Sequence, residues 1–497
     1  MAGLKLRLTI LSAVAVFAIL LLLCVPQIYF NWGYHNDEPT KVTQILDGVW
    51  NLRHPPLMLG VVSLLGKLTG QQDPQRIVEY GRWVSVLSIG ALLLACLGIA
   101  SLRAGAAAGL AAGVLLLFHP YVFEVAHYFK EDSMFLAAEM GVLLLLFYCE
   151  RTPGRRAEIF LAVVLALAVS AKYIGWGLLP LVLLFVILNR KKYAGRWCWF
   201  WGWPLEAFVV LALLINLPLV ANWHGFRESL GDEMYRLEKG DYGMHSSGSM
   251  GRRYVFLVLQ QMPPVLVFGY LFYVLYRLCR WRSTAVAEWI FLGTPLLTLA
   301  LLALTAKYSE RYILPVLVPA TVAAVYGPLL VLGEWLRGRT CFAQASKIIA
   351  AVLLVGSGWW LWGEWYKIYD GFRHDSRMEL TEWICRNLPE DALIAQDTYA
   401  KINPYDLQQR VLIDNFFVAD IGSLDELRRM GVTQVIISYD VYHRFVDGSV
   451  NPPKNQLQDF ERRRLFYETA RRKLKILWQD DNANPKALHP GLMLIQL

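Results

Sequence analysis

Residues Leu8–Ile28 read LTILSAVAVFAILLLLCVPQI, an uncharged apolar run long enough to cross a lipid bilayer as one helix. Lys5 and Arg7 precede the run, as they would in a secretory signal peptide, but the run reaches Ile28 without a small-residue cleavage site. We therefore expect a retained membrane helix. Further apolar runs follow, and all of them together predict about eleven membrane spans, at 6–28, 83–102, 105–120, 132–148, 157–171, 173–189, 203–222, 254–276, 286–305, 310–334 and 348–366.

The composition agrees with a polytopic α-helical membrane protein. Of the 497 residues, 56% are hydrophobic and only 18% are charged, whereas soluble domains contain about 25% charged residues. The formal net charge is +8, but the basic residues lie in short loops between apolar runs and form no basic stripe of the kind that binds DNA. The charge therefore reflects membrane topology, and nucleic acid is excluded as a partner.

The loops between the spans alternate in charge. One set is short and basic, and by the positive-inside rule it is cytoplasmic. The other set is longer, mixed in sign and contains most of the acidic residues. With an odd number of spans, the N-terminus is then cytoplasmic and the chain after about residue 367 is extracytoplasmic, which together with the short basic loops favours a bacterial inner membrane. The basic loops contain Lys5, Arg7, Arg103, Arg151, Arg155, Arg156, Arg190, Lys191, Lys192, Arg196, Arg277, Arg280, Arg282, Arg337, Arg339 and Lys347.

The sequence predicts two domains. The membrane domain comprises residues 1–366 and includes two polar outer segments, at 29–82 and 224–253. In the first segment, Thr40–Leu52 and Leu57–Leu68 have the patterns of short helices that lie along the membrane surface. The second segment contains several glycines and serines, which predicts a flexible loop over a substrate.

Residues 367–497 alternate between helical and strand patterns, which predicts a small soluble α/β domain outside the membrane. It contains a single cysteine, Cys385, so it has no internal disulfide. We expect helices at Ser376–Asn387, Leu424–Met430 and Gln456–Lys473, and strands at Ala392–Asp397, Arg410–Asp414, Thr433–Tyr439, Leu474–Gln479 and Gly491–Gln496.

Asp37 and Glu38 are the first candidates for catalysis, because they lie a few residues beyond the outer end of the first span. Carboxylates next to a membrane core are costly and are usually functional when they face a cavity. The alternative is an ordinary solvated loop acid. The pair follows a cluster of aromatic residues and precedes Arg53-His54-Pro55-Pro56, which favours the catalytic interpretation.

A second polar group lies between the third and fourth spans. Glu131 and Asp132 begin the fourth span, where carboxylates complement the helix dipole, and this capping role alone would account for them. The functional alternative is a second acidic site for substrate, comprising Asp132, Glu131, His54 and His119. A divalent cation such as Mg or Mn is a further possibility, although the spacing is not diagnostic; its candidate ligands are Asp37, Asp132, His119 and His127.

Basic residues at the outer ends of the spans form the third group. Lys172 interrupts two apolar runs, and Lys307-Tyr308-Ser309-Glu310-Arg311-Tyr312 separates two more. Such side chains often extend to the membrane surface without any further role. If they converge with Arg53 on one cavity, they would instead bind a phosphate group, because arginine offers two parallel hydrogen bonds and lysine a point charge.

A carboxylate base and fixed cations in an outward cavity suit one reaction, the transfer of a sugar from a lipid-linked phosphate to an acceptor. The base takes the proton of an acceptor hydroxyl, and the cations stabilise the charge that accumulates on the departing phosphate. A phosphate leaves without a general acid, so one carboxylate suffices, unlike in glycoside hydrolysis. Direct displacement inverts the anomeric configuration.

Two other functions compete with this one. A secondary transporter or flippase of lipid-linked or polar substrates would place ionisable residues near the bilayer midplane and interrupt helices at corresponding points of two halves. The charges of this chain cluster instead at the outer boundary, which disfavours transport. A membrane scaffold that only presents the α/β domain would place no demand on Asp37.

At these residues the chain resembles the GT-C glycosyltransferases. Tyr34-His35-Asn36-Asp37-Glu38 followed by Arg53-His54-Pro55-Pro56-Leu57 is similar to their first outer loop, and most similar to the branch of protein O-mannosyltransferases and aminoarabinose transferases (families 39 and 83). The likeness continues at Lys172-Tyr173-Ile174-Gly175 and Arg311-Tyr312-Ile313-Leu314-Pro315.

The resemblance implies specific roles. Asp37 would be the catalytic base, and Asp132, Lys172 and Arg311 would bind the donor, a polyprenyl- or dolichyl-phosphate sugar. The chain would be a hexosyl- or pentosyltransferase that modifies an envelope lipid, a glycan or a protein. Two departures from the family pattern narrow the possible activities and acceptors. The C-terminal region lacks the Trp-Trp-Asp motif of oligosaccharyltransferases, which disfavours that activity, and the predicted helix count is below that of the aminoarabinose branch, which argues against lipid A as the acceptor.

Overall fold

The structure is a computed structural model, and it describes the chain except for residues 1, 31–36, 191–202, 240–249, 336–341, 374, 447–451, 453–455 and 481–490. The chain divides into two compact units. The helical unit comprises Met1–Tyr29, Val42–Met234 and Met250–Tyr366, and the α/β unit comprises Phe30–Lys41, Tyr235–Ser249 and Lys367–Leu497.

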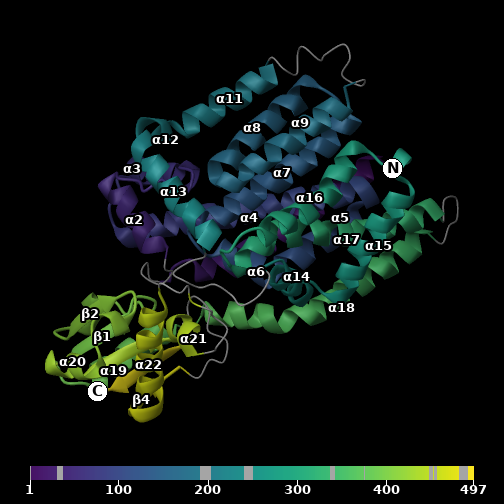
Figure 1. Ribbon diagram of the computed structural model, residues 1–497. Coiled ribbons are helices and arrows are strands. Elements are labelled where there is room, and N and C mark those ends of the chain that lie inside the picture. Colours follow the sequence, from purple (N-terminus) through teal and green to yellow (C-terminus); the bar gives the residue numbers. More distant parts are fainter. Residues whose placement is uncertain are drawn as a thin grey trace. The chain divides into compact units, whose positions relative to one another are not determined.

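Each apolar run found in the sequence coincides with a helix or with two consecutive helices (Figure 1). Within the helical unit, α4 packs against α5, α7 and α17, and α7 also packs against α8. The long helices are α1 (Ala2–Cys24), α4 (Pro74–Ala104), α7 (Glu131–Arg151), α8 (Arg155–Ala171), α16 (Val286–Ala303), α17 (Leu314–Trp335) and α18 (Phe342–Gly371), the last of which continues into the α/β unit. The shorter elements are η1 (Val25–Gln27), α2 (Glu38–Asp47), α3 (Leu57–Thr69), α5 (Ala106–Leu117), α6 (Pro120–Ala126), η2 (Tyr173–Gly177), α9 (Leu178–Leu188), α11 (Trp203–Ile215), α12 (Leu217–Ala221), α13 (Trp223–Lys239), α14 (Met250–Gln261), α15 (Pro264–Cys279), η3 (Trp281–Ser283) and η4 (Glu310–Ile313).

Among the described residues, 5 helices are long and apolar enough to cross a membrane. The number rises to 7 if two bent pairs each form one span: α5 with α6, bent by 69°, and α14 with α15, bent by 114°. Both bends coincide with a proline, Pro120 or Pro264, at the first position of the second helix, where the missing amide proton is tolerated. The total of about eleven spans stays a prediction.

The prediction of a flexible loop over residues 224–253 is wrong for its first half. Helix α13 covers Trp223–Lys239, and α14 begins at Met250; Gly240–Ser249 lies outside the described residues. The segment from Arg227 to Lys239 is rich in Arg, Glu, Leu and Met, which are good helix formers. Its low hydrophobicity and the glycines that follow it concealed this helix.

The α/β unit contains one five-stranded sheet of order β2-β1-β3-β5-β4. Strand β1 is parallel to β2 and β3, and β5 is antiparallel to β3 and β4. The sequence predicted every strand and three of the helices to within two residues at each end, and it missed α21. The elements are α19 (Ser376–Asn387), β1 (Leu393–Asp397), η5 (Pro404–Leu407), β2 (Val411–Asn415), η6 (Val418–Asp420), α20 (Leu424–Arg429), β3 (Gln434–Ser438), α21 (Tyr439–Val446), α22 (Leu457–Lys473), β4 (Ile476–Gln479) and β5 (Leu492–Gln496).

Alternate residues of the central strands pack on opposite faces of this sheet, as the two-residue period of a strand requires. On one face, Ala395, Val435 and Ile495 join a core with residues of α20, α21 and α22. On the other face, Ile394 and Ile436 join a core with residues of α19. Both faces are covered, so the central strands contain consecutive apolar residues, 393–395 in β1 and 435–437 in β3.

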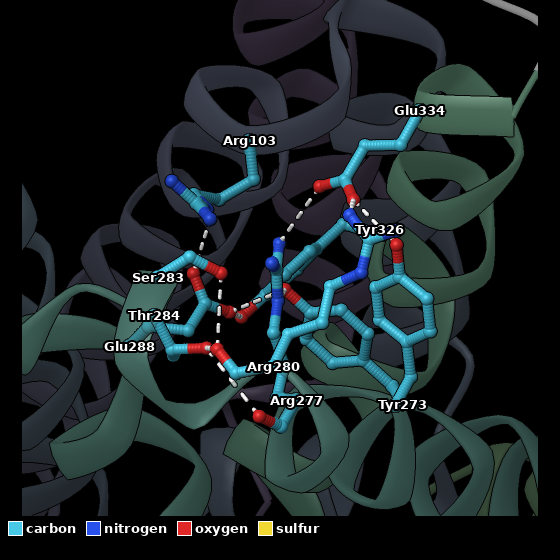
Figure 2. Close-up of polar contacts among 10 residues, drawn as sticks. Arg103, Tyr273, Arg277, Arg280, Ser283, Thr284, Glu288, Tyr326 and Glu334 are labelled. Carbon is cyan, nitrogen blue, oxygen red and sulfur yellow. Dashed lines mark hydrogen bonds and ion pairs between the residues drawn. The ribbon is translucent and has the colours of Figure 1, made fainter.

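A buried polar network joins four helices of the helical unit (Figure 2). The carboxylate of Glu288 in α16 is fully buried, and it forms an ion pair with Arg103 at the end of α4. The hydroxyls of Tyr273 in α15 and Tyr326 in α17 each donate to the same oxygen of Glu288 at 2.7 Å. A buried carboxylate is tolerated only with such partners, so this network joins the four helices to one another.

A second carboxylate extends the network. Glu334 of α17 lies 3.4 Å from the Arg277 guanidinium and 3.2 Å from that of Arg280 (Figure 2). It also accepts a hydrogen bond from the Tyr276 hydroxyl. In the sequence, Arg103, Arg277 and Arg280 were interpreted only as topological charges. In the structure, they also bind carboxylates: Arg103 pairs with the buried Glu288, and Arg277 and Arg280 pair with the half-buried Glu334.

Candidate active site

Asp132 lies at the centre of a polar cluster in the helical unit. It belongs to the first turn of α7, and its side chain is almost completely buried. The Lys172 ammonium lies 2.6 Å from one carboxylate oxygen, and Nε of Arg311 lies 3.6 Å from the other. These three residues come from the start of α7, the end of α8 and η4, so the fold brings together side chains that are far apart in the chain. A helix-capping role alone does not describe Asp132.

The ring of Tyr312 is the second element of this cluster. The ammonium of Lys172 lies 4.9 Å from the ring centroid, the guanidinium of Arg311 lies 5.7 Å from it and the ammonium of Lys307 lies 5.9 Å from it. Cations at such distances are attracted to the face of an aromatic ring. Lys307 also forms an ion pair of 2.6 Å with Glu233 of α13. We call the six residues Asp132, Lys172, Glu233, Lys307, Arg311 and Tyr312 the cation cluster.

Lys307 stays protonated at neutral pH. Burial disfavours its ammonium form, but Tyr312 and the hydrogen bond to Glu233 outweigh burial and raise the pKa of Lys307 above its ordinary value. The cation cluster thus contains three cations and two carboxylates, Asp132 and Glu233. Its excess of positive charge suits an anionic ligand, and a phosphate group accepts the charge-assisted hydrogen bonds that arginine and lysine donate.

The segment that carries Arg53 and His54 is fixed next to this cluster. The hydroxyl of Tyr173, which follows Lys172, donates to the carbonyl of Leu52 at 2.8 Å. The hydroxyl of Ser229 in α13 donates to the carbonyl of Asn51. Both Arg53 and His54 are half-buried in the helical unit. Two separate helices thus hold the backbone immediately before Arg53.

Gly175 is required by the close approach of the turn that follows Lys172. A Cβ atom on Gly175 would lie 2.3 Å from the backbone oxygen of Ala168, which is too close for any real side chain. The glycine therefore lets η2 fold back against the end of α8, and this places Lys172 and Tyr173. In the sequence, Gly175 appeared only as part of a family-like motif.

Two residues of the site escaped the sequence analysis. Glu233 lies in α13, which was mistaken for a loop; the helical pattern of that segment was the signal that would have identified it. Tyr254 in α14 is fully buried, and its hydroxyl donates to the carbonyl of Lys307 at 3.0 Å and accepts from the Ser309 amide at 3.3 Å. It therefore holds the loop that carries Lys307. No local signal in the sequence pointed to Tyr254.

His119 and His127 are buried and do not belong to the cation cluster. His127 is fully buried, its Nδ1 is 2.8 Å from the Phe123 carbonyl oxygen, and its ring lies 4.6 Å from that of Phe123. His119 is buried before the first residue of α6, with its ring 6.2 Å from that of Tyr121. Glu131, next to Asp132, is also buried. His119, His127 and Glu131 are thus as buried as the side chains of a packed core.

The side chains do not fit the predicted divalent-cation site. Within the described part of the chain, no three His, Cys, Asp or Glu residues are grouped so that they could hold a metal ion. The carboxylate of Asp132 is held by two cations, and His127 bonds to the backbone.

Asp37 and Glu38 belong to the α/β unit. Asp37 is half-buried, and its carbonyl accepts a hydrogen bond of 3.4 Å from the Lys41 amide, which begins α2. Glu38 is fully buried in the first turn of α2. Tyr34, His35 and Asn36 of the same motif lie outside the described residues.

Comparison with known proteins relates the fold to that of solved membrane enzymes. No protein-family model matches the sequence, and no curated protein matches it. The structure is similar to that of ArnT from Cupriavidus metallidurans bound to undecaprenyl phosphate, with a TM-score of 0.56 and 14% sequence identity over 100% of this chain and 98% of that chain. It is also similar to that of the archaeal oligosaccharyltransferase AglB from Archaeoglobus fulgidus in complex with an inhibitory peptide and a dolichol-phosphate. There the TM-score is 0.52 and the identity 12%, over 89% of this chain and 71% of that chain. Both are GT-C glycosyltransferases, so the GT-C fold that the sequence predicted is confirmed.

Proposed function

We propose that this protein is a membrane glycosyltransferase that moves a sugar from a polyprenyl-phosphate donor to an acceptor on the extracytoplasmic side of the inner membrane. The observation that carries the proposal is the cation cluster, which surrounds Tyr312 with three cations inside a GT-C fold. ArnT was solved with undecaprenyl phosphate and AglB with a dolichol-phosphate, so two proteins of this fold bind the class of anionic lipid that such a cluster fits.

In this proposal, Lys172, Lys307 and Arg311 bind the phosphate of the donor, with Arg53 as a further contact. Asp132 and Tyr312 hold these cations in place before the donor arrives. Such preorganised charges stabilise the phosphate more strongly as negative charge builds up on it. The donor sugar is a hexose or a pentose, and the acceptor is an envelope lipid, a glycan or a protein.

The transfer itself is a single displacement. An oxygen of the acceptor attacks the anomeric carbon while the bond from that carbon to the phosphate oxygen breaks, and the bonding electrons leave with the polyprenyl phosphate. Asp37, with Glu38 beside it, takes the proton of the acceptor hydroxyl as general base. Attack from the opposite side inverts the anomeric configuration.

Binding of undecaprenyl phosphate tests the donor site. The purified protein in lipid nanodiscs is titrated with undecaprenyl phosphate, and Lys172→Ala and Arg311→Ala are each expected to weaken binding by about 10-fold or more, since a hydrogen bond to a charged group contributes about 1.5–3 kcal/mol. The control is Lys67→Ala, because Lys67 is an exposed lysine in α3 and should not matter. If both cluster variants bind like the wild type, the assignment is wrong.

Replacement of Asp37 tests the chemistry. Lipid extracts of cells without the protein should accumulate a glycosyl polyprenyl phosphate, and Asp37→Asn should fail to reverse this accumulation while Asp47→Asn, at an exposed acid of α2, restores it. Full activity of Asp37→Asn would refute the assignment of Asp37 as the general base. A transporter or flippase would move the glycosyl lipid between leaflets and would not consume it.

A further inference from the structure

Arg444 of α21 is a half-buried arginine whose guanidinium is held in place but not neutralised. Its Nε donates to the carbonyl of Asp440, one helical turn earlier, at 2.8 Å, and the guanidinium carbon lies 5.2 Å from the centroid of the Tyr399 ring. Neither contact supplies a negative charge. Nη1 of Arg444 is buried, and no acceptor in the described part of the chain bonds to it. An unsatisfied buried donor is costly, especially on a charged group, so this nitrogen indicates a place for a ligand oxygen.

Two other arginines of the α/β unit show how this fold satisfies a guanidinium. The Nη2 atom of the buried Arg410 donates to two backbone carbonyls, at 3.1 and 2.6 Å. Arg463 binds both carboxylate oxygens of Asp420, at 2.9 and 2.8 Å. Within the described residues, Nη1 of Arg444 has no bond of either kind.

The buried carboxylate of Asp397 does not fill this role. Arg444 lowers the pKa of Asp397, against the effect of burial. The oxygens of Asp397, however, are held by the Val418 amide, the Ser438 amide and the Tyr467 hydroxyl. None of these three donors is Arg444, so the guanidinium remains available to a ligand.

The sheet places Arg444 where α/β folds bind ligands. Tyr399 follows the carboxyl end of β1, and α21, which carries Arg444, begins directly after the carboxyl end of the parallel neighbour β3. From β1 the chain continues to β2 on one side, and from β3 it continues to β4 and β5 on the other. Ligands of open α/β sheets bind outside the carboxyl ends of parallel strands whose connections diverge in this way.

Aromatic and polar groups at the end of β2 extend this edge. Phe416 directly follows β2, is half-buried and lies 5.4 Å from Tyr399, ring to ring. The hydroxyl of Thr398, the residue before Tyr399, donates to the exposed carboxylate of Asp414 at 2.9 Å. The carboxyl ends of three strands thus carry a guanidinium, two aromatic rings and polar oxygens. A few polar groups among aromatic side chains suit a small organic ligand, and a sugar combines an apolar ring face with hydroxyls.

We propose that Arg444 anchors a binding site for an acidic sugar, and that this sugar is part of the acceptor. The carboxylate or phosphate of the sugar accepts two hydrogen bonds from the guanidinium, because arginine binds such groups in a bidentate manner. The ring of the sugar lies near Tyr399 and Phe416. The role of the ligand as acceptor rests on the proposed function, whereas the binding of an acidic sugar does not. The site gives the α/β unit a part in selecting the acceptor.

Saturation-transfer NMR with soluble sugars tests the site without any assay of transfer. The full-length protein in detergent is titrated with glucuronate, which carries a carboxylate, with glucose 6-phosphate and with neutral glucose. At least one acidic sugar should bind the wild type, and the comparison of the two shows which anionic group the site takes. Arg444→Gln should weaken this binding by about 10-fold or more, because charge-assisted hydrogen bonds are lost. Glucose should bind the wild type no better than Arg444→Gln. If neither acidic sugar binds the wild type, or if the variant binds equally well, the proposal is overturned.

Arg429→Gln is the matched control. Arg429 in α20 is an exposed arginine of the same unit, and its Nε also donates to the carbonyl four residues earlier, that of Asp425, at 3.4 Å. This variant should bind acidic sugars like the wild type. Arg444→Lys keeps the charge without the planar guanidinium, so its affinity should lie between those of the wild type and Arg444→Gln. Thermal midpoints show whether each variant is folded. If Arg444→Gln does not fold, Arg444→Lys decides, and wild-type affinity in that variant rejects the site.

Lipid extracts test whether the ligand is the acceptor. In cells that lack the protein, Arg429→Gln should reverse the accumulation of glycosyl polyprenyl phosphate, and Arg444→Gln should reverse it only in part. Complete reversal by an Arg444→Gln protein that no longer binds acidic sugars would reject the acceptor role. If the wild-type protein itself does not reverse the accumulation, the proposed function fails, and the NMR titration still decides whether the sugar site exists.

Discussion

Asp397 at the end of β1 is fully buried, and its carboxylate oxygens accept hydrogen bonds from the Val418 amide at 2.8 Å, the Ser438 amide at 3.1 Å and the Tyr467 hydroxyl at 2.7 Å. Burial raises the pKa of Asp397 to about 7, even though these hydrogen bonds act in the opposite direction. The group joins η6, β3 and α22 to the central strand, so its protonation state affects the whole α/β unit.

The stability of the protein should therefore fall as the pH rises from about 4 to about 7. In the unfolded chain the pKa of Asp397 is near 3.8, so within this window the folded state binds more protons than the unfolded state, and deprotonation favours unfolding. The full shift corresponds to about 4 kcal/mol. The measurement is the thermal midpoint of the full-length protein in detergent at pH 5 and pH 7.5, and the decrease between them should be smaller in Asp397→Asn. An equal decrease in both proteins would contradict this account.

Asp132 shows what residue-level reasoning can predict. An acidic residue at the start of an apolar helix is visible in the sequence, and so are the isolated cations Lys172 and Arg311. That all three meet was a hypothesis with an equally good capping alternative, because residues 40 and 179 positions apart give no local sign of contact. Asp132, Lys172 and Arg311 meet only because α7 packs against α8 and η4 lies next to them.

At the scale of the element, η2 should tolerate very little change at Gly175. Gly175→Ala forces a Cβ atom against the backbone of α8 and should displace Lys172, which lowers the affinity for undecaprenyl phosphate by about 10-fold or more, because charge-assisted contacts are lost. Gly177→Ala is a matched control in the same turn, since a Cβ atom there meets nothing within 4 Å. Titration in nanodiscs measures both variants. Similar affinities for the two would show that the turn does not position Lys172.

Elements were predictable where the apolar pattern was strong. Each strand of the α/β unit contains three or four consecutive apolar residues next to polar ones, so the strand ends were found closely. Helix α21 was missed because Tyr439 follows β3 without any turn residue, and its aromatic residues suit a strand as well as a helix. Helix α13 was missed because its residues are mostly polar.

At the scale of the whole molecule, the fold was recognisable from motifs too short for a family model to match. The chain shares the fold of ArnT over its whole length although only 14% of the residues are identical. The two compact units were less predictable: the sequence places Asp37 beside the first membrane helix, whereas its contacts group it with the α/β unit. Contacts of that kind arise only once the chain has folded.

The membrane topology makes a last prediction about two cysteines. Cys279 is exposed at the end of α15, next to the basic loop of Arg277, Arg280 and Arg282, and the positive-inside rule places it in the cytoplasm. Cys385 in α19 is half-buried, with its thiol 3.5 Å from the Asp406 carbonyl, and the predicted topology places it outside.

A maleimide that cannot cross the membrane should therefore label a variant that retains only Cys385 in intact cells. The variant that retains only Cys279 should react only after the cells are permeabilised, and a variant without cysteines measures background. The two thiols report on opposite ends of α16, α17 and α18, so an odd number of membrane crossings between them gives opposite labelling. If both cysteines react in intact cells, or neither does, the donor phosphate and the α/β unit cannot both face outwards as the proposed reaction requires.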